Sequence, residues 1–253
     1  MTTAADATTS SDAPDVPMFR FRVPHGFHEV PLGVTPEAHA QLLQEFAQDY
    51  WGDDEGLAPL RAMTGALYGA ARHALAAQGV RYQAVGIFPR AADTQRDGEH
   101  EEPSDEQDKP LPYARNSLLA AVHDLESRDP DLAAAGIAET LFRQHPDDEV
   151  VRVDLPAGPA VLHAAASRLL WDGPDAPEQL ADTVRTTARL ELWIPFPSGD
   201  RILLLTLTTP DTEDLDTHQA LLAEVAGTVE FAIEGEFPPD EPADPRAQVN
   251  PFG

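Results

Sequence analysis

Cysteine is absent from the 253-residue sequence, and this absence removes whole classes of chemistry. Disulfide bonds, thiolate metal sites and a cysteine nucleophile all require a thiol. No window approaches the roughly 18 consecutive apolar residues of a membrane-spanning helix. Residues 1–17 are small, polar and acidic, without the basic and apolar regions of a signal peptide. We therefore expect a soluble cytoplasmic protein with no membrane insertion.

Basic residues are scarce as well. The 17 Lys and Arg residues stand against 44 Asp and Glu residues, which gives a formal net charge of -27. Such a surface repels nucleic-acid phosphates and anionic lipid headgroups, so we exclude DNA, RNA and membrane-surface roles. The charge favours solubility, and it would also steer a basic protein toward the molecule. Few aromatics and Ala-rich segments indicate a high-GC bacterial genome.

Catalytic and cofactor motifs are also missing. The sequence has no Gly-x-Ser-x-Gly elbow, no Gly-x-x-x-x-Gly-Lys-Ser/Thr phosphate loop and no His-Glu-x-x-His pair. The acidic run Asp147-Asp148-Glu149 would support acid–base chemistry only inside a buried pocket, and runs flanked by loops are usually solvated. We therefore predict no catalytic residue, no metal site and no bound cofactor.

What the sequence does contain is a regular pattern of strands. Alternating apolar and polar residues indicate half-buried strands. The predicted strands cover residues 18–23, 27–32, 80–88, 113–125, 150–155, 160–170, 184–196 and 201–208. Residues Ala188, Leu190, Leu192 and Ile194 share one face of their strand. The strand at 201–208 is so apolar that we expect it at the centre of a sheet.

Four segments show helical spacing instead. Pro36 stands at the first position of a predicted helix that ends near residue 50. A second helix is expected over 57–77, and a third begins after Asp129-Pro130 and ends at His145-Pro146. The last predicted helix starts within Asp211–Asp216 and carries an apolar stripe to Ile233.

The order of these elements predicts one architecture. Consecutive strands joined by short turns must be antiparallel, and helices grouped on the faces of such a sheet give an α+β sandwich. We expect one domain over residues 17–234, with an acidic insertion at 93–109 between two hairpin strands. The tails at 1–16 and 235–253 are expected to be disordered. Whether the helices over 35–77 pack on the main core is left open.

Four aromatic residues are candidates for contact with another protein. Tyr50 and Trp51 stand beside the acidic run that begins at Asp53, and Trp171 precedes Asp172. Trp193 points to the opposite side of its strand from the apolar face. Aromatic side chains at the ends of elements suit a protein–protein contact, and the alternative is that each simply caps the core.

The two ends of the domain resemble a known fold. Phe21-Arg22-Val23-Pro24-His25-Gly26-Phe27 opens the domain, and near its end Leu190–Pro195 leads through a turn to Ile202–Pro210. A helix ending in Gly227-Thr228-Val229-Glu230-Phe231 follows. This pattern resembles actinobacterial proteins of the Mog1/PsbP-like fold. The resemblance implies a binding or assembly module without a shared catalytic site.

These features favour a non-catalytic adaptor or assembly accessory factor that binds another, basic protein. Two alternatives stay open: an acidic chaperone or immunity-type protein for one cognate effector, and an enzyme whose site has no recognised motif. The three differ in what they require, because an enzyme needs a pocket that holds at least two convergent titratable groups. The oligomeric state and the identity of the partner stay open.

Overall fold

The computed structural model describes residues 18–30, 32, 36–59, 61–62, 64–65, 75, 77–90, 113–170 and 184–232. The predicted disordered tails at 1–16 and 235–253 lie outside these residues, as do the acidic insertion at 93–109 and Trp171.

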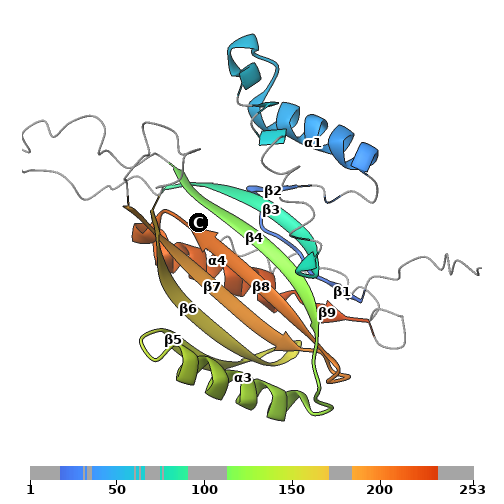
Figure 1. Cartoon of the computed structure of the whole chain (residues 1–253), viewed down its shortest axis with the longest axis vertical. Coiled ribbons are helices and arrows are strands. Elements are labelled where there is room, and N and C mark those ends of the chain that lie inside the picture. Colours follow the sequence, from blue (N-terminus) through green and yellow to red (C-terminus); the bar gives the residue numbers. More distant parts are fainter. Residues whose placement is uncertain are drawn as a thin grey trace, which may run out of the picture.

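A seven-stranded antiparallel sheet forms the centre of the described structure (Figure 1). Its strands are β2 (Phe27–Glu29), β3 (Val80–Pro89), β4 (Tyr113–Asp124), β5 (Glu149–Leu155), β6 (Gly158–Leu170), β7 (Val184–Pro195) and β8 (Arg201–Thr209). They lie in the order β2-β3-β4-β8-β7-β6-β5. The expected α+β class is confirmed, and the apolar strand β8 occupies the central position.

The β3–β4 pair confirms the expected pairing on either side of the acidic insertion. Pro89 lies opposite Tyr113, and one register continues to Tyr82 opposite Ala120, where a bulge shifts it so that Val80 lies opposite Ala121. There Gly79 has a φ of +71°, and a side chain on it would come within 2.4 Å of the Val122 carbonyl oxygen. Glycine is therefore required where the chain enters β3.

The helices are α1 (Pro36–Trp51), α3 (Pro130–Gln144) and α4 (Leu215–Gly227), with short 3-10 helices η1 (Glu55–Leu57) and η3 (Thr212–Asp214). The helix predicted over 57–77 is described only in part, and its described residues from 58 to 65 are helical. The helix α3 lies on one face of β5, β6 and β7, where Ala134 and Leu141 pack with Val161 and Trp193.

The opposite face of the sheet carries the main core. The four residues expected to share a face of β7 are all buried, and Leu190, Leu192 and Ile194 pack with apolar residues of β4, β8 and α4. From α4 this core takes Leu221, Leu222, Val225 and Ala226. Alternation along the strands thus sends one set of side chains to α4 and the other set to the α3 side.

The prediction that the last helix continues to Ile233 is wrong. The helix α4 ends at Gly227, and Glu230–Phe231 instead forms a short strand, β9, that pairs with β1 (Phe19–Arg20). The Thr228 hydroxyl donates to the Val225 carbonyl and accepts from the Arg22 amide, which turns the chain out of the helix. The ring of Phe231 then packs on Phe196, so tertiary contacts override the helical spacing.

The helix α1 has an apolar cluster of its own. Leu43 and Phe46 are buried against Val30, and Tyr50 and Val85 pack around them. Val85 belongs to β3, so α1 rests on the edge of the sheet, away from the main core. This contact answers the question left open for the first helix.

Candidate functional site

The two candidate aromatic residues at the end of α1 contact each other. The rings of Tyr50 and Trp51 meet edge to face at 5.1 Å, and Tyr50 also contacts Phe46 and His28. The Trp51 indole donates to the Thr64 hydroxyl at 2.9 Å. Burial raises the pKa of the Tyr50 phenol, and the nearby Tyr113 adds to this shift. Both side chains are therefore largely engaged within the chain.

Trp193 lies apart from these two residues. It is half-buried beneath α3, beside Ala134 and Val161, and its indole N–H is buried without a hydrogen-bond acceptor among the described residues. The expectation that it faces away from Leu192 is confirmed, because Leu192 belongs to the core on the other face. The structure does not bring Trp193 together with the aromatic pair of α1.

A buried histidine between two carboxylates joins the α3 side of the sheet to the start of β5. His163 is 1% exposed, and its Nδ1 and Nε2 lie 2.9 Å from the Glu191 and Asp148 carboxylates respectively. A carboxylate can only accept, so both contacts are hydrogen bonds when both ring nitrogens carry protons. Arg189 lies 3.1 Å from the second oxygen of Glu191, and His145 packs on the His163 ring.

The second buried histidine lies near the start of α4. The His218 Nε2 is 2.9 Å from the Thr209 hydroxyl, and its Nδ1 is 3.2 Å from the Asn116 amide nitrogen. The Thr209 hydroxyl donates to the Arg115 carbonyl, so it accepts from His218, and Nδ1 in turn accepts from Asn116. Burial lowers the pKa of His218, in agreement with this neutral ring, while the charge of Asp214 opposes the shift.

Ion pairs near this histidine join β4, and the residue that follows β3, to η3 and the residue that precedes it. Asp211 accepts from the backbone and side chain of Arg115. Arg90 contacts Glu213 at 2.6 Å and Asp214 at 2.7 Å. Burial acts to raise the pKa of Asp211, but the hydrogen bonds from Arg115 and the arginine charges outweigh it and hold that pKa below its usual value.

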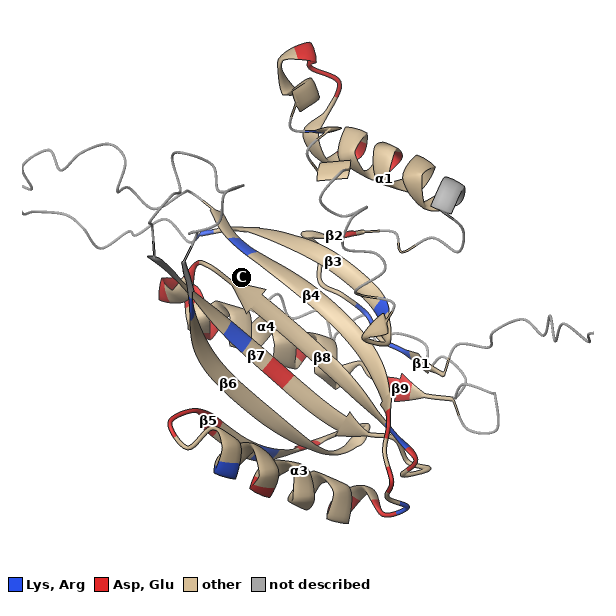
Figure 2. Ribbon diagram, viewed as in Figure 1, with Lys and Arg blue, Asp and Glu red and all other residues tan. Residues whose placement is uncertain are grey.

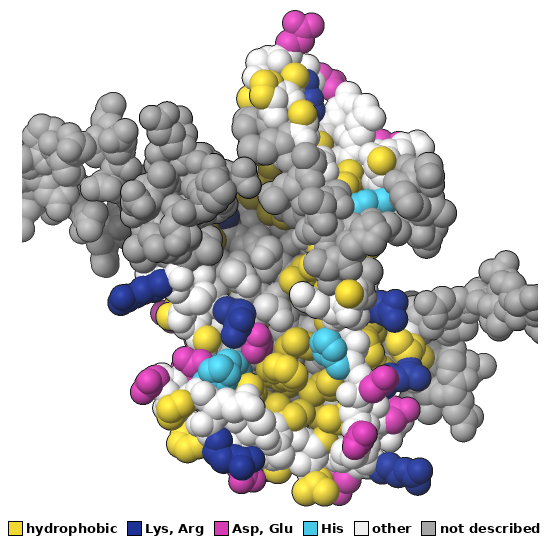
Figure 3. Space-filling view, in the orientation of Figure 1, with side chains coloured by type: hydrophobic (Ala, Val, Ile, Leu, Met, Phe, Trp, Pro, Cys, Tyr) yellow, Lys and Arg dark blue, Asp and Glu magenta, His cyan; other side chains and the backbone are white. Residues whose placement is uncertain are grey.

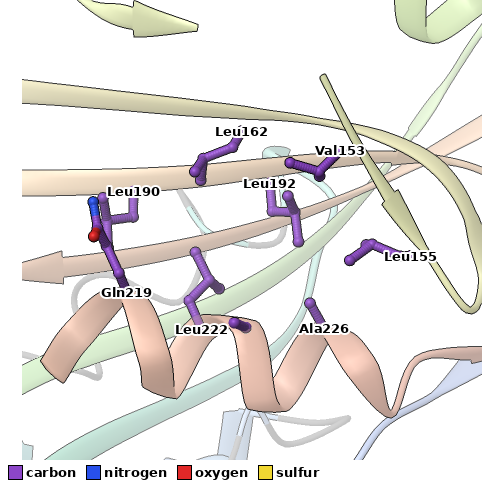
Figure 4. Close-up of a pocket in the computed structure, with 9 residues that line it drawn as sticks. Val153, Leu155, Leu162, Leu190, Leu192, Gln219, Leu222 and Ala226 are labelled. Carbon is purple, nitrogen blue, oxygen red and sulfur yellow. The ribbon is translucent and has the colours of Figure 1, made fainter. Parts of the chain in front are cut away.

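An apolar cavity of about 130 Å³ lies between α4 and the strands at the β5 edge of the sheet. The helix contacts β7 and β8, so the neighbouring surface of β5 and β6 extends past it. Figure 4 shows the side chains of the strands and of α4 directed into the same space. This surface, the α4 groove, is lined by Val153, Leu155, Leu162, Leu190, Leu192, Gln219, Leu222, Ala223 and Ala226.

The other face of the sheet is more mixed in chemistry. Figure 3 shows apolar side chains gathered over the middle of this face, with histidines and charged side chains on both sides. The strand registers place Leu119 and Leu204 here, on the same side as Trp193, and both are partly exposed. This face is therefore a secondary candidate for contact with another molecule.

Neither a metal site nor a membrane span emerges from the described residues. Within them, no group of three His, Asp or Glu side chains is placed to hold a metal ion. None of the helices in the described ranges is both long and apolar enough to cross a membrane.

The α4 groove and the two histidine clusters were not predicted from sequence. Alternation along the strands does place His163 and Glu191 on the same face of the sheet as Trp193, so the sequence contained a signal for the His163 cluster. Nothing local marks the groove, because it depends on how far α4 extends across the sheet. A scan against protein-family models finds no match for this chain, and a search of curated proteins finds none either.

Proposed function

We propose that the protein is a non-catalytic binding module, an adaptor or assembly accessory factor, which holds a basic partner protein through the α4 groove. The observation that carries this proposal is an open apolar groove in a molecule whose net charge is -27.

The groove leaves apolar surface in contact with water. Val153, Leu155 and Leu162 are only partly buried, while Leu190 and Leu192 on the neighbouring strand β7 are buried. A partner side chain that enters would remove this surface from water, which is favourable. Apolar cavities of about 150 Å³ accept a benzene ring. The groove therefore suits one aromatic or branched aliphatic side chain of the partner.

The charges near the groove favour a basic partner. The helix α4 contains no Lys or Arg, and its residues Asp216 and Glu224 are exposed. Figure 2 shows acidic residues at the start of this helix and along the turns around the sheet. Attraction between an acidic surface and a basic partner speeds association and weakens as salt is added.

The chemistry of the groove supports binding over catalysis. Its lining has one polar side chain, Gln219, and no titratable group. An acid–base mechanism needs convergent titratable groups in a pocket. The buried residues His163 and His218 are each held by hydrogen bonds from within the chain, as a structural role requires.

Two exposed alanines on α4 provide a matched test. Ala223 lines the groove, whereas Ala220, one turn earlier and also exposed, does not. Ala223→Trp fills the groove without disturbing the buried core, and Ala220→Trp adds the same side chain outside it. Tagged wild-type protein and both variants would be used to capture partners from the native lysate at low salt, followed by quantitative mass spectrometry.

We expect a partner that the wild type and Ala220→Trp retain, that Ala223→Trp loses, and that high salt releases. The purified partner should then bind Ala223→Trp at least about tenfold more weakly in calorimetry. A single stoichiometric partner would indicate a protein for one cognate effector, and several partners would indicate an adaptor. Equal capture by both variants, or no partner at any salt concentration, would contradict the proposal.

A further inference from the structure

The strand β5 ends the seven-stranded sheet, and its outer edge is open among the described residues. There its only pairing is with β6. Glu149, Val151, Arg152 and Asp154 are all exposed. Such an edge presents backbone N–H and C=O groups to any strand that approaches.

The register of the β5–β6 hairpin shows which backbone groups point outward. Asp154 lies opposite Pro159, which has no N–H and so cannot form a hydrogen-bonded pair. Because the two kinds of pair alternate, Val150, Arg152 and Asp154 direct their backbone groups away from β6. Val151 and Val153 direct theirs toward β6.

The side chains of β5 are complementary to those of a second, antiparallel copy of β5. Charged residues usually protect an exposed edge from pairing. Here Arg152 and Asp154 have opposite signs and lie two residues apart. In an antiparallel pair of two β5 strands centred on Val153, each Arg152 lies opposite the Asp154 of the other copy. The same register puts Val151 opposite Leu155, so charge meets charge on one face and apolar meets apolar on the other.

We propose that β5 pairs with β5 of a second copy, so that the protein forms a twofold-symmetric dimer with Val153 on the symmetry axis. The two sheets join into one, and the outward backbone groups of Arg152 and Asp154 form the new hydrogen-bonded pairs. The twofold axis is perpendicular to the joined sheet, so both α4 grooves lie on the same face of the dimer. This contact does not require the groove to have a partner.

Cysteine substitution gives a direct test, because the natural chain has no cysteine. In the proposed register the two Val153 residues form a non-hydrogen-bonded pair, whose Cα atoms lie about 4.5 Å apart, within disulfide range. Val153→Cys should therefore cross-link under mild oxidation. Val151→Cys is the control: Val151 is the more exposed, at 41%, but lies opposite Leu155 and should stay unlinked. Cross-linking of Val151→Cys as fast as Val153→Cys, or none at Val153→Cys, would overturn the proposal.

A charge exchange tests the same register without cysteine. Arg152→Asp and Asp154→Arg each place like charges opposite each other twice, and should raise the dimer dissociation constant by about tenfold or more in sedimentation equilibrium. The double variant restores opposite charges in reverse order and should dimerise like the wild type. A double variant as weak as the single variants, or a wild type that stays monomeric at every concentration and salt level, would refute the dimer. Both results are independent of whether the Ala223→Trp variant loses a captured partner.

Discussion

The imidazole of His163 connects three parts of the sheet. It lies on β6, bonds Glu191 on β7, and bonds Asp148 immediately before β5. With the exposed Arg189 beside Glu191, the group around the ring contains two acidic and two basic side chains. A balanced set of charges can be buried at modest cost, but removal of one member leaves another unpaired.

Replacement of His163 by alanine should therefore be severe. We expect a loss of about 3 kcal/mol in the free energy of unfolding, because the Glu191 and Asp148 carboxylates lose their donor. Urea denaturation measures this loss. His145→Ala removes an exposed neighbour of the same ring and should cost about 0.5 kcal/mol or less. Equal losses in the two variants would show that the buried ring bonds contribute nothing.

The second histidine predicts how stability changes with pH. The pKa of His218 in the folded chain lies below its ordinary value of 6.5, so the unfolded chain takes up the proton first. Its contribution is complete above pH 6.5 and is lost as the pH falls through the folded-state pKa. Asp211, with a pKa below 3.8, loses its contribution in a more acidic step.

Unfolding free energies of the wild type and His218→Gln across this range test the sign. The charged groups around the ring, namely Asp211, Glu213, Asp214 and Arg90, stay the same in both proteins. The wild type should lose stability more steeply than the variant just below pH 6.5. Parallel curves would contradict the assignment of a buried neutral ring.

Among the elements, α3 shows how local sequence sets a boundary. The Asp129 carboxylate accepts from the amides of Asp131 and Leu132, and Pro130 takes the first helical position. Asp129→Ala should cost about 1 kcal/mol of stability. Glu139→Ala, which removes only an exposed 3.9 Å ion pair with Arg143, should cost about 0.5 kcal/mol or less. Thermal unfolding compares the two, and a larger loss for Glu139→Ala would argue against the cap.

Most of the strands and the three described helices could be predicted from sequence, because alternation and helix caps are local signals. The faces of β7 were also predictable, since Leu190 and Leu192 alternate with Trp193. The helix that covers Trp193 was not, because alternation assigns a side and does not identify what packs there. The same limit hid the α4 groove, whose walls come from four separate elements. Alternation predicted a strand at 18–23, but its pairing with β9, with Phe19 opposite Phe231, has no local signal.

For the whole molecule, the charge of -27 makes the two proposed contacts respond oppositely to salt. Two copies of the chain repel each other, and screening over about 10 Å near 0.1 M salt relieves this repulsion. The dimer should therefore strengthen with added salt, although its exposed ion pairs each lose up to about 1 kcal/mol. Binding of a basic partner should weaken. Measurement of both across one salt series separates the two contacts.

The pairing of β4 with β8 also affects how the chain folds during its synthesis. Ser117–Asp124 pairs with Arg201–Thr208, so the inner edge of β4 has no partner until roughly eighty more residues have been synthesised. At about 5–20 residues per second, this delay lasts several seconds. During translation the β3–β4 hairpin presents an apolar strand edge beside the ribosome. The acidic residues encoded just before β4, in the insertion at 93–109, have already emerged when the nascent chain is most prone to associate with its neighbours.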